Sequence, residues 1–198
     1  MSHTVTKGHL YTTVKCARAG GSTLAREWVR NDNGYWLNEK DEVVYLHNPR
    51  VIVDADFIRE SLHGHLYIHL AEESVFTHYH LMIRMLLNSG HDVWADSTNS
   101  HPSSLRKLFS IDPDMIVTFV NTPENICVQR AHDSGQSDLV EKGVIKRMWS
   151  QIVALANSTR DYHEGLWTGT NLNAEQMQTF ETDVYRGIEK IRKEVISG

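Results

Sequence analysis

The residues with the clearest potential for chemistry lie between Lys15 and Thr23, where the sequence reads Lys-Cys-Ala-Arg-Ala-Gly-Gly-Ser-Thr. A β-branched run precedes this stretch and a helix-forming run follows it. That order is typical of a phosphate-binding loop, in which backbone N–H groups at a helix N-terminus surround an anion. In the usual pattern, G-x-x-x-x-G-K-[ST], Gly20 and Ser22 would be the second glycine and the hydroxyl residue. Gly21 stands in the place of the lysine, so the usual cation of the loop is missing.

Two basic side chains of the same stretch could replace that cation. Lys15, which stands at the position of the pattern's first glycine, ends the predicted strand and could fold back over the loop. Arg18 lies at the predicted crest of the loop and could meet phosphate groups directly. In the opposite interpretation, Lys15 points into solvent, and Arg18 lies on the surface of a collapsed loop without contacting phosphate groups. The sequence leaves both interpretations open.

Charged side chains also follow the second predicted strand of the core, the short apolar run at residues 51–53. Asp54 and Asp56 come directly after it, and Arg59 follows within one helical turn. A wholly apolar strand of this length is typical of a parallel sheet and is expected to be buried on both faces, and the ligands of such sheets bind beyond the carboxyl ends of the strands. Asp56 could instead cap the short helix predicted over residues 57–62, which would make it a structural residue.

A third predicted strand, residues 92–95, leads into Asp96 and Asn99. The sequence Asp-Ser-Thr-Asn at this point could be an ordinary turn in which an Asx side chain bonds to nearby backbone. Residues 20–23 and 54–59 are polar segments at the ends of two other predicted strands. Three such ends in one parallel sheet would converge, so we expect them to share a single crevice.

The elements that must position these groups alternate along the chain. Predicted strands cover residues 4–16, 51–53, 92–95 and 115–120, and predicted helices cover 22–30, 57–62, 71–88, 102–108, 123–131, 143–156 and 174–196. A hairpin is expected over residues 35–46, a polar, flexible link over 132–137, and a cap at Thr122 with Pro123 opening the next helix. Strands alternating with helices predict an α/β fold of three layers with a mostly parallel central sheet. Residues 1–198 are predicted to form a single domain.

Composition narrows the classes of partner. The chain of 198 residues has a formal net charge of -5, which argues against coating nucleic acid through bulk charge but allows a local basic groove. Cys16 and Cys127 have apolar neighbours and are expected to be reduced thiols, which favours a cytoplasmic setting. No apolar run has transmembrane length, and residues 1–10 lack the apolar part of a signal peptide, so no membrane partner is expected. Residues 63–80, where the histidines are most closely spaced, contain no H-E-x-x-H motif. A metal site is therefore not favoured among His63, His65, His69, His78 and His80.

The order of these segments resembles the polynucleotide-kinase branch of the P-loop kinases. The resemblance rests on Ser-Thr-x-Ala-Arg-Glu at residues 22–27, Asp-x-x-Arg at 56–59, Leu-Leu-x-Ser-Gly at 86–90, Asp-Ser-Thr-Asn at 96–99 and Gln-Arg at 129–130. The chain is most similar to the phage 5′-polynucleotide kinase domain and more distantly resembles Zeta-toxin-like kinases. The resemblance covers about residues 11–156 and implies the three-layer P-loop NTPase fold of nucleotide kinases.

The resemblance also implies a role for each residue that matches the family's motifs. Asp56 falls at the general base, Arg59 at the clamp for the acceptor phosphate, and Asp96 at the strand-end carboxylate that orients the loop and the acceptor. Ser22 falls at the hydroxyl that meets Mg²⁺ or the β-phosphate, and Arg130 falls at the first arginine of the lid. With ATP and Mg²⁺ as the implied cofactors, the residues expected around the donor phosphates are Lys15, Arg18, Gly20, Gly21, Ser22, Thr23 and Arg130.

Three functions remain open at this stage. The first is a phosphotransferase that moves the γ-phosphate of ATP to a hydroxyl of a nucleic acid or nucleotide. The second is a protein that only binds a phosphorylated or nucleic-acid ligand, because Gly21 replaces the loop lysine and Ser134 or a neighbour replaces the second lid arginine. The third is a transferase or lyase with different chemistry in the same acceptor cleft. The predicted final helix either covers the sheet or pairs with a second subunit, so a homo-oligomer is also open.

Overall fold

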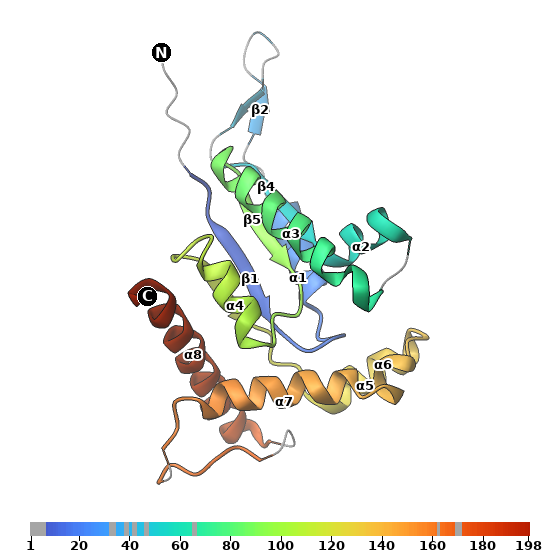
Figure 1. Cartoon of the computed structure of the whole chain (residues 1–198), viewed down its shortest axis with the longest axis vertical. Helices are drawn as coiled ribbons and strands as arrows, with labels where there is room; N and C mark the ends of the chain where they lie inside the picture. Colours follow the sequence, from blue (N-terminus) through green and yellow to red (C-terminus); the bar gives the residue numbers. More distant parts are fainter. Residues whose placement is uncertain are drawn as a thin grey trace. The chain divides into compact units, whose positions relative to one another are not determined.

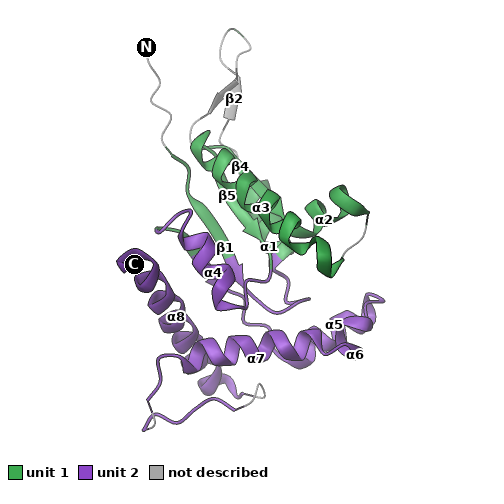
Figure 2. Ribbon diagram, viewed as in Figure 1, with its two compact units in different colours: residues 1–12, 22–97, 114–116 green, residues 13–21, 98–113, 117–198 purple. Residues whose placement is uncertain are grey.

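The computed structural model describes residues 7–31, 35–37, 40, 43–45, 48–64, 67–161, 163–168 and 172–198. Figure 1 shows the elements, which in chain order are β1 (Leu10–Val14), α1 (Gly21–Arg30), β2 (Tyr35–Leu37), β3 (Val43–Tyr45), β4 (Arg50–Asp54), α2 (Ala55–His63), η1 (His69–Ala71), α3 (Glu72–Asn88), β5 (Asp92–Asp96), α4 (Pro102–Phe109), β6 (Ile116–Phe119), α5 (Glu124–Asp133), α6 (Asp138–Glu141), α7 (Val144–Asn157) and α8 (Ala174–Ser197). The chain divides into two compact units (Figure 2). Unit 1 comprises residues 1–12, 22–97 and 114–116, and unit 2 comprises residues 13–21, 98–113 and 117–198.

Four parallel strands form the main sheet, in the order β4-β5-β1-β6. Helices flank this sheet, so the predicted α/β architecture with a parallel sheet is confirmed. Strands β2 and β3 form a separate antiparallel pair, in which Trp36 lies opposite Val44. Strand β1 begins at Leu10, later than the predicted start at residue 4, and residues 4–6 lie outside the described part of the chain.

The register of the sheet decides which strand ends meet. Val51 of β4 lies opposite Val93 of β5, and Asp54 at the end of β4 lies opposite Asp96 at the end of β5. Because these strands are parallel, the polar segments that follow them start at the same edge of the sheet. β4 is the outermost strand on this side, and Val53 is its one fully buried residue. The expectation that this strand is buried on both faces was therefore wrong.

Helix α3 packs against β4 and β5 and supplies much of the apolar core of unit 1. Its buried residues recur every fourth position, as the helical repeat of 3.6 residues requires, and they are Val75, Tyr79, Ile83 and Leu87. Met82 has the helical spacing of this apolar face, three positions after Tyr79, but it is 43% exposed. The helix begins at Glu72 because the preceding residues form the 3₁₀ turn η1.

Trp28 anchors α1 within unit 1. Its ring centroid lies 4.9 Å from that of Tyr11 in β1 and 5.5 Å from that of Trp94 in β5. The guanidinium of Arg50 lies 4.9 Å from the same ring centroid and donates a hydrogen bond to the carbonyl oxygen of Trp28 at 3.0 Å. Aromatic packing of this kind fixes the position of the helix whose first turn contains Ser22.

Phe180 of α8 lies at the centre of the core of unit 2. It packs against Trp149 of α7, Phe119 of β6 and Trp167, with ring centroids 6.1, 6.1 and 5.5 Å away. Helices α7 and α8 approach closely at Gly187, where a Cβ atom would lie 2.3 Å from the carbonyl oxygen of Leu155. The amphipathic pattern of both predicted helices is therefore explained by their packing.

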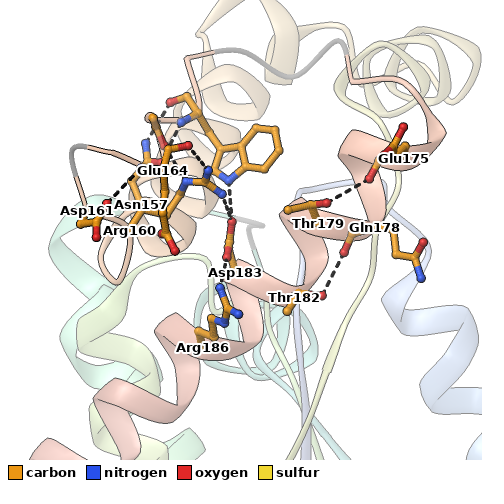
Figure 3. A network of polar contacts seen from close by, with 12 residues as sticks. Asn157, Arg160, Asp161, Glu164, Glu175, Gln178, Thr179, Thr182, Asp183 and Arg186 are labelled. Atoms are coloured by element: carbon orange, nitrogen blue, oxygen red, sulfur yellow. Dashed lines mark hydrogen bonds and ion pairs between the residues drawn. The ribbon is translucent and has the colours of Figure 1, made fainter.

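A buried carboxylate ties the segment after α7 to α8, as Figure 3 shows. Asp183 is 0% exposed and accepts hydrogen bonds from Arg160, from Nε1 of Trp167 at 2.9 Å and from Nη1 of Arg186 at 3.0 Å. The same segment is held by Asn157, whose Nδ2 and Oδ1 bond to the carbonyl and N–H of Trp167. This network is the polar counterpart of the Phe180 core.

Two local predictions in unit 2 were wrong. Thr122 does not cap α5: the N-cap is Pro123, which makes no side-chain capping bond, and Thr122 contacts the loop before α1 instead. The segment expected to be a flexible link contains the end of α5, which continues to Asp133. The short helix α6 then follows before α7.

Candidate functional site

The chain that leads to Gly21 forms a tight loop. The N–H of Ala19 donates to the carbonyl oxygen of Cys16 at 3.2 Å and closes a turn. Arg18 and Gly20 have φ angles of 66° and 102°. Glycine adopts such values without strain, whereas arginine is rarely found there. Since α1 begins at Gly21, the backbone has the predicted order of strand, loop and helix.

Two side chains from later in the chain hold this loop within unit 2. Nη1 of Arg130 donates to the carbonyl oxygens of Arg18 and Ala19 at 3.3 and 3.2 Å. The hydroxyl of Thr122 donates to the carbonyl oxygen of Ala19 at 2.8 Å. Arg130 was expected to contact donor phosphates as part of a lid, and the structure places its guanidinium on the backbone of the loop.

Lys15 lies inside the loop region and not in solvent. The residue is 7% exposed, and its N–H donates to the carbonyl oxygen of Thr98 at 2.9 Å. A Cβ atom on Gly21 would lie 2.3 Å from Cδ and 2.5 Å from Nζ of Lys15. The end of the lysine side chain therefore fills the space in which a side chain at position 21 would begin. The interpretation in which Lys15 points into solvent is wrong, whereas Arg18 is exposed.

The two cysteines adjoin the same loop and contact each other. Cys16 and Cys127 are both free thiols and both buried. Their mutual hydrogen bond raises the pKa of Cys16 and lowers the pKa of Cys127, and burial adds to the rise for Cys16. The sulfur of Cys16 also donates to the carbonyl oxygen of Ile145 at 3.5 Å. These contacts pack the first residue of the loop against α5 and α7.

In unit 1, the carboxylate that caps α2 belongs to Asp54. Its Oδ1 accepts a hydrogen bond from the N–H of Asp56 at 2.8 Å, and the helix begins at Ala55. The alternative in which Asp56 is the cap is therefore wrong. Asp56 lies in the first turn, with its side chain 70% exposed. Burial raises the pKa of Asp54, and the negative charges of Asp96 and Asp56 act in the same direction.

Arg59 lies between two carboxylates of unit 1. Its Nη1 is 2.5 Å from Oδ1 of Asp56, while Nε and Nη2 donate to the two carboxylate oxygens of Glu72 at 2.8 and 2.7 Å. The guanidinium carbon also lies 5.5 Å from the ring centroid of Phe76. The bond to Glu72 raises the pKa of Arg59, and burial opposes that rise. Two residues of α3 that the sequence analysis did not single out thus orient Arg59.

Asp96 and Tyr79 complete this group. Asp96 ends β5 and is 4% exposed. Tyr79 is 1% exposed, and its hydroxyl oxygen is buried without a hydrogen-bond partner in the part of the chain that the structure describes. Burial raises the pKa of Tyr79, the charges of Asp96 and Asp54 raise it further, and Arg59 acts in the opposite direction. The phenol is therefore within electrostatic range of the predicted acceptor residues, although periodicity marked it only as a packing residue.

The predicted site residues fall into two local groups. Unit 1 gathers Asp56 and Arg59 next to the paired strand ends that carry Asp54 and Asp96. Unit 2 contains the loop residues Lys15, Arg18, Gly20 and Gly21, together with Arg130, which contacts the loop. Ser22 and Thr23 lie in the first turn of α1, where Ser22 is half-buried and Thr23 is exposed.

Neither a cluster of metal-binding side chains nor a membrane-spanning helix is present among the described residues. They contain no group of three or more His, Cys, Asp or Glu side chains that could hold a metal ion. Among the five histidines considered above as a metal site, His65 lies outside the described residues. None of the described helices combines the length and apolar character needed to cross a membrane.

The comparisons with known proteins show likeness in structure alone. No family model and no curated protein matches the chain. Two solved structures of the Pnkp1/Rnl/Hen1 RNA repair complex contain similar chains. One aligns with a TM-score of 0.53 and 17% identity over 96% of this chain and 48% of that chain. The other has a TM-score of 0.51 and 21% identity over 66% of this chain and 42% of that chain. This chain thus spans less than half the length of the chains it matches, and at these identities the likeness concerns the fold.

Proposed function

We propose that this protein is a phosphotransferase that moves the γ-phosphate of ATP to a hydroxyl group of a nucleic acid or nucleotide. The observation that carries the proposal is the pair formed by Asp56 and Arg59, whose charged atoms are 2.5 Å apart next to the paired ends of β4 and β5. A carboxylate base and a guanidinium are the two groups that a hydroxyl acceptor with a neighbouring phosphate requires. The P-loop NTPase fold is part of this proposal.

The two groups have distinct tasks in the proposed reaction. The acceptor oxygen forms a bond to the γ-phosphorus while the bond from that phosphorus to the bridging oxygen of ADP breaks, and the acceptor's proton passes to Asp56. Asp56 suits this task because its carboxylate is 70% exposed and can be reached by a substrate. Arg59 holds the acceptor phosphate through the second N–H of Nη1, since Glu72 occupies Nε and Nη2 and Asp56 accepts the first N–H of Nη1.

ATP and Mg²⁺ are the cofactors of the proposal. The half-buried hydroxyl of Ser22 at the start of α1 is a hard oxygen donor that fits Mg²⁺. Mg²⁺ in phosphoryl-transfer sites is held by few protein groups together with phosphate oxygens and water, so a single hydroxyl of the chain can serve as its protein ligand. Bound there, Mg²⁺ would neutralise charge on the transferred group. Gly20, Gly21 and Thr23 would surround the donor phosphates with backbone N–H groups.

Nucleic acid is the first class of acceptor to test. The support is the likeness in fold to chains of an RNA repair complex. With a net charge of -5, the chain needs local contacts such as Arg59 to hold a nucleic-acid end. The acceptors to be tested are therefore DNA and RNA oligonucleotides with 5′-hydroxyl ends, together with nucleosides and nucleotides.

The test measures transfer of label from [γ-³²P]ATP in the presence of Mg²⁺. Wild type should label at least one acceptor, and Asp56→Asn should slow transfer by about 10²–10⁴-fold because the general base is lost. Glu60→Gln is the matched control, since it removes one carboxylate charge from an exposed position of the same helix. A wild type that transfers no label and shows no ATP-dependent rise in melting temperature would refute the proposal. Retained binding of oligonucleotide ends would then favour a protein that only binds its ligand.

A further inference from the structure

We propose that Lys15, the residue that follows β1, supplies the cation of the phosphate loop. In the usual pattern that cation is a lysine at position 21. The inference rests on the proposed function, because it names the residue that would meet the donor's phosphates. It is carried by the placement of one buried side chain against one glycine, Gly21, both of them in unit 2.

The position of the ammonium group is the first step. Nζ of Lys15 lies 2.5 Å, and Cε 2.9 Å, from the point that a Cβ of Gly21 would occupy. Gly21 is the first residue of α1, and a helix N-terminus favours negative charge through its N–H groups and dipole. A cation at this place adds to the same field. The lysine of the common pattern at position 21 is thus replaced by one at position 15, whose ammonium lies close to where the first side-chain atom of residue 21 would be.

Burial distinguishes Lys15 from the other candidate, Arg18. Lysine is among the residues least often buried, yet Lys15 is only 7% exposed, so its ammonium is held in place by the fold. Arg18 is exposed, and the loop uses its backbone, since its carbonyl accepts a hydrogen bond from Arg130. A fixed charge in a partly desolvated site binds a phosphate better than a mobile, hydrated one.

Gly21 contributes by having no side chain. The atoms that a Cβ would meet are Cδ, Cε and Nζ of Lys15, the far end of a flexible side chain. A side chain at position 21 would therefore displace the ammonium at little cost in stability. This reverses the effect expected from the motif alone: Gly21→Lys should weaken binding while Lys15 is present and should strengthen it when Lys15 is removed.

The experiment measures the affinity of each variant for ATP with Mg²⁺ by calorimetry. Lys15→Met should weaken binding by about tenfold to a hundredfold, the range for loss of a charge-assisted hydrogen bond. Lys146→Met removes the same charge from an exposed position of α7 and is the matched control. It should change affinity by less than about threefold, because exposed charges contribute little. Far-UV circular dichroism and the melting temperature without ligand establish that each variant is folded.

An exchange of positions tests the geometry. Lys15→Ala should weaken binding, and adding Gly21→Lys to it should recover about tenfold or more, whereas Gly21→Lys alone should weaken binding. Such non-additivity is the signature of two residues that share one space. Gly21→Ala is an independent variant that keeps Lys15 in the chain. It should melt close to wild type and bind MgATP several times more weakly, so it decides the matter if Lys15→Met does not fold.

The outcomes separate this inference from the function on which it rests. A wild type that does not bind MgATP overturns the proposed function and this inference with it. A wild type that binds, together with unchanged affinity in Lys15→Met or in Gly21→Ala, overturns the inference alone. Weaker binding in the Lys15 variant with recovery in the exchanged variant supports it.

Discussion

Replacing Asp183 by Asn should destabilise unit 2 strongly, although the change removes only one charge. The carboxylate is 0% exposed and accepts hydrogen bonds from Arg160, Trp167 and Arg186. The side chain of Arg160 is only 13% exposed, so it cannot recover full hydration when its partner is neutral. An amide also presents an NH₂ group that repels one of the donors.

The expected loss of stability follows from that burial. Breaking a buried ion pair by neutralising one partner costs about 3–5 kcal/mol, because the remaining charge stays buried. A domain of ordinary stability has about 5–15 kcal/mol in total. At about 2–4 °C per kcal/mol for a chain of this size, the melting temperature should fall by ~6–20 °C.

The assay is urea unfolding monitored by circular dichroism, with Glu194→Gln as the control. Glu194 pairs with Arg106 at 2.9 Å in the same unit, but the two side chains are 43% and 50% exposed. Such a surface pair should contribute less than about 1 kcal/mol. A loss below about 1 kcal/mol for Asp183→Asn, or equal losses in both variants, would refute the reasoning that burial sets the strength of this network.

Three further changes have defined outcomes. Gly187→Ala should lower the free energy of unfolding by about 1–3 kcal/mol in urea, because its Cβ would lie 2.3 Å from the backbone oxygen of Leu155 and a backbone atom cannot easily move. Tyr79→Phe should raise it by about 1–3 kcal/mol, since the variant lacks a buried hydroxyl without a partner among the described residues, and a loss instead would reveal a bonded hydroxyl. Asp54→Asn keeps the acceptor for the N–H of Asp56 and removes a carboxyl whose pKa is raised by burial. The folded state holds the proton of that carboxyl more tightly than the unfolded chain, so its ionisation opposes folding above the folded-state pKa. The Asn variant should therefore gain stability relative to wild type at neutral pH, and unfolding curves at lower pH should show the gain shrinking as the pH falls through that pKa.

The sequence predicted the elements wherever apolar periodicity and turn residues agree. The four-residue repeat from Val75 to Leu87 defined α3 to within one residue at its start. Helix α6 was not predicted because its four residues are too few to display a period. The wrong prediction of a cap at Thr122 and the wrong alternative of a cap at Asp56 share one cause. Several residues near a helix start can cap it, and the choice depends on backbone geometry and on distant partners such as Ala19.

The grouping of Asp56 and Arg59 with the ends of β4 and β5 could be predicted in part, because parallel strands place their ends at one edge. That Asp54 and Asp96 lie at the same edge follows from that rule, whereas their direct pairing is known only from the structure. Glu72 could not be predicted as the partner of Arg59. The two residues are thirteen positions apart, and the pattern of residue types does not show where their side chains point. Tyr79 was hidden for a related reason: a buried aromatic residue on an apolar stripe looks the same whether or not its hydroxyl has a partner.

The loop shows why a motif is better interpreted as a set of positions in space than as a string of letters. Gly21 breaks the phosphate-loop pattern, and taken alone it predicts a loop without its cation. The structure relates this glycine to Lys15, because the absence of a Cβ at one position creates the space that the ammonium of the other occupies. A cation has to reach the phosphates, and the chain position from which it starts is not fixed by the chemistry. In the role proposed for Lys15, the two departures from the pattern compensate each other, and the exchange of lysine between positions 15 and 21 measures how fully they do so.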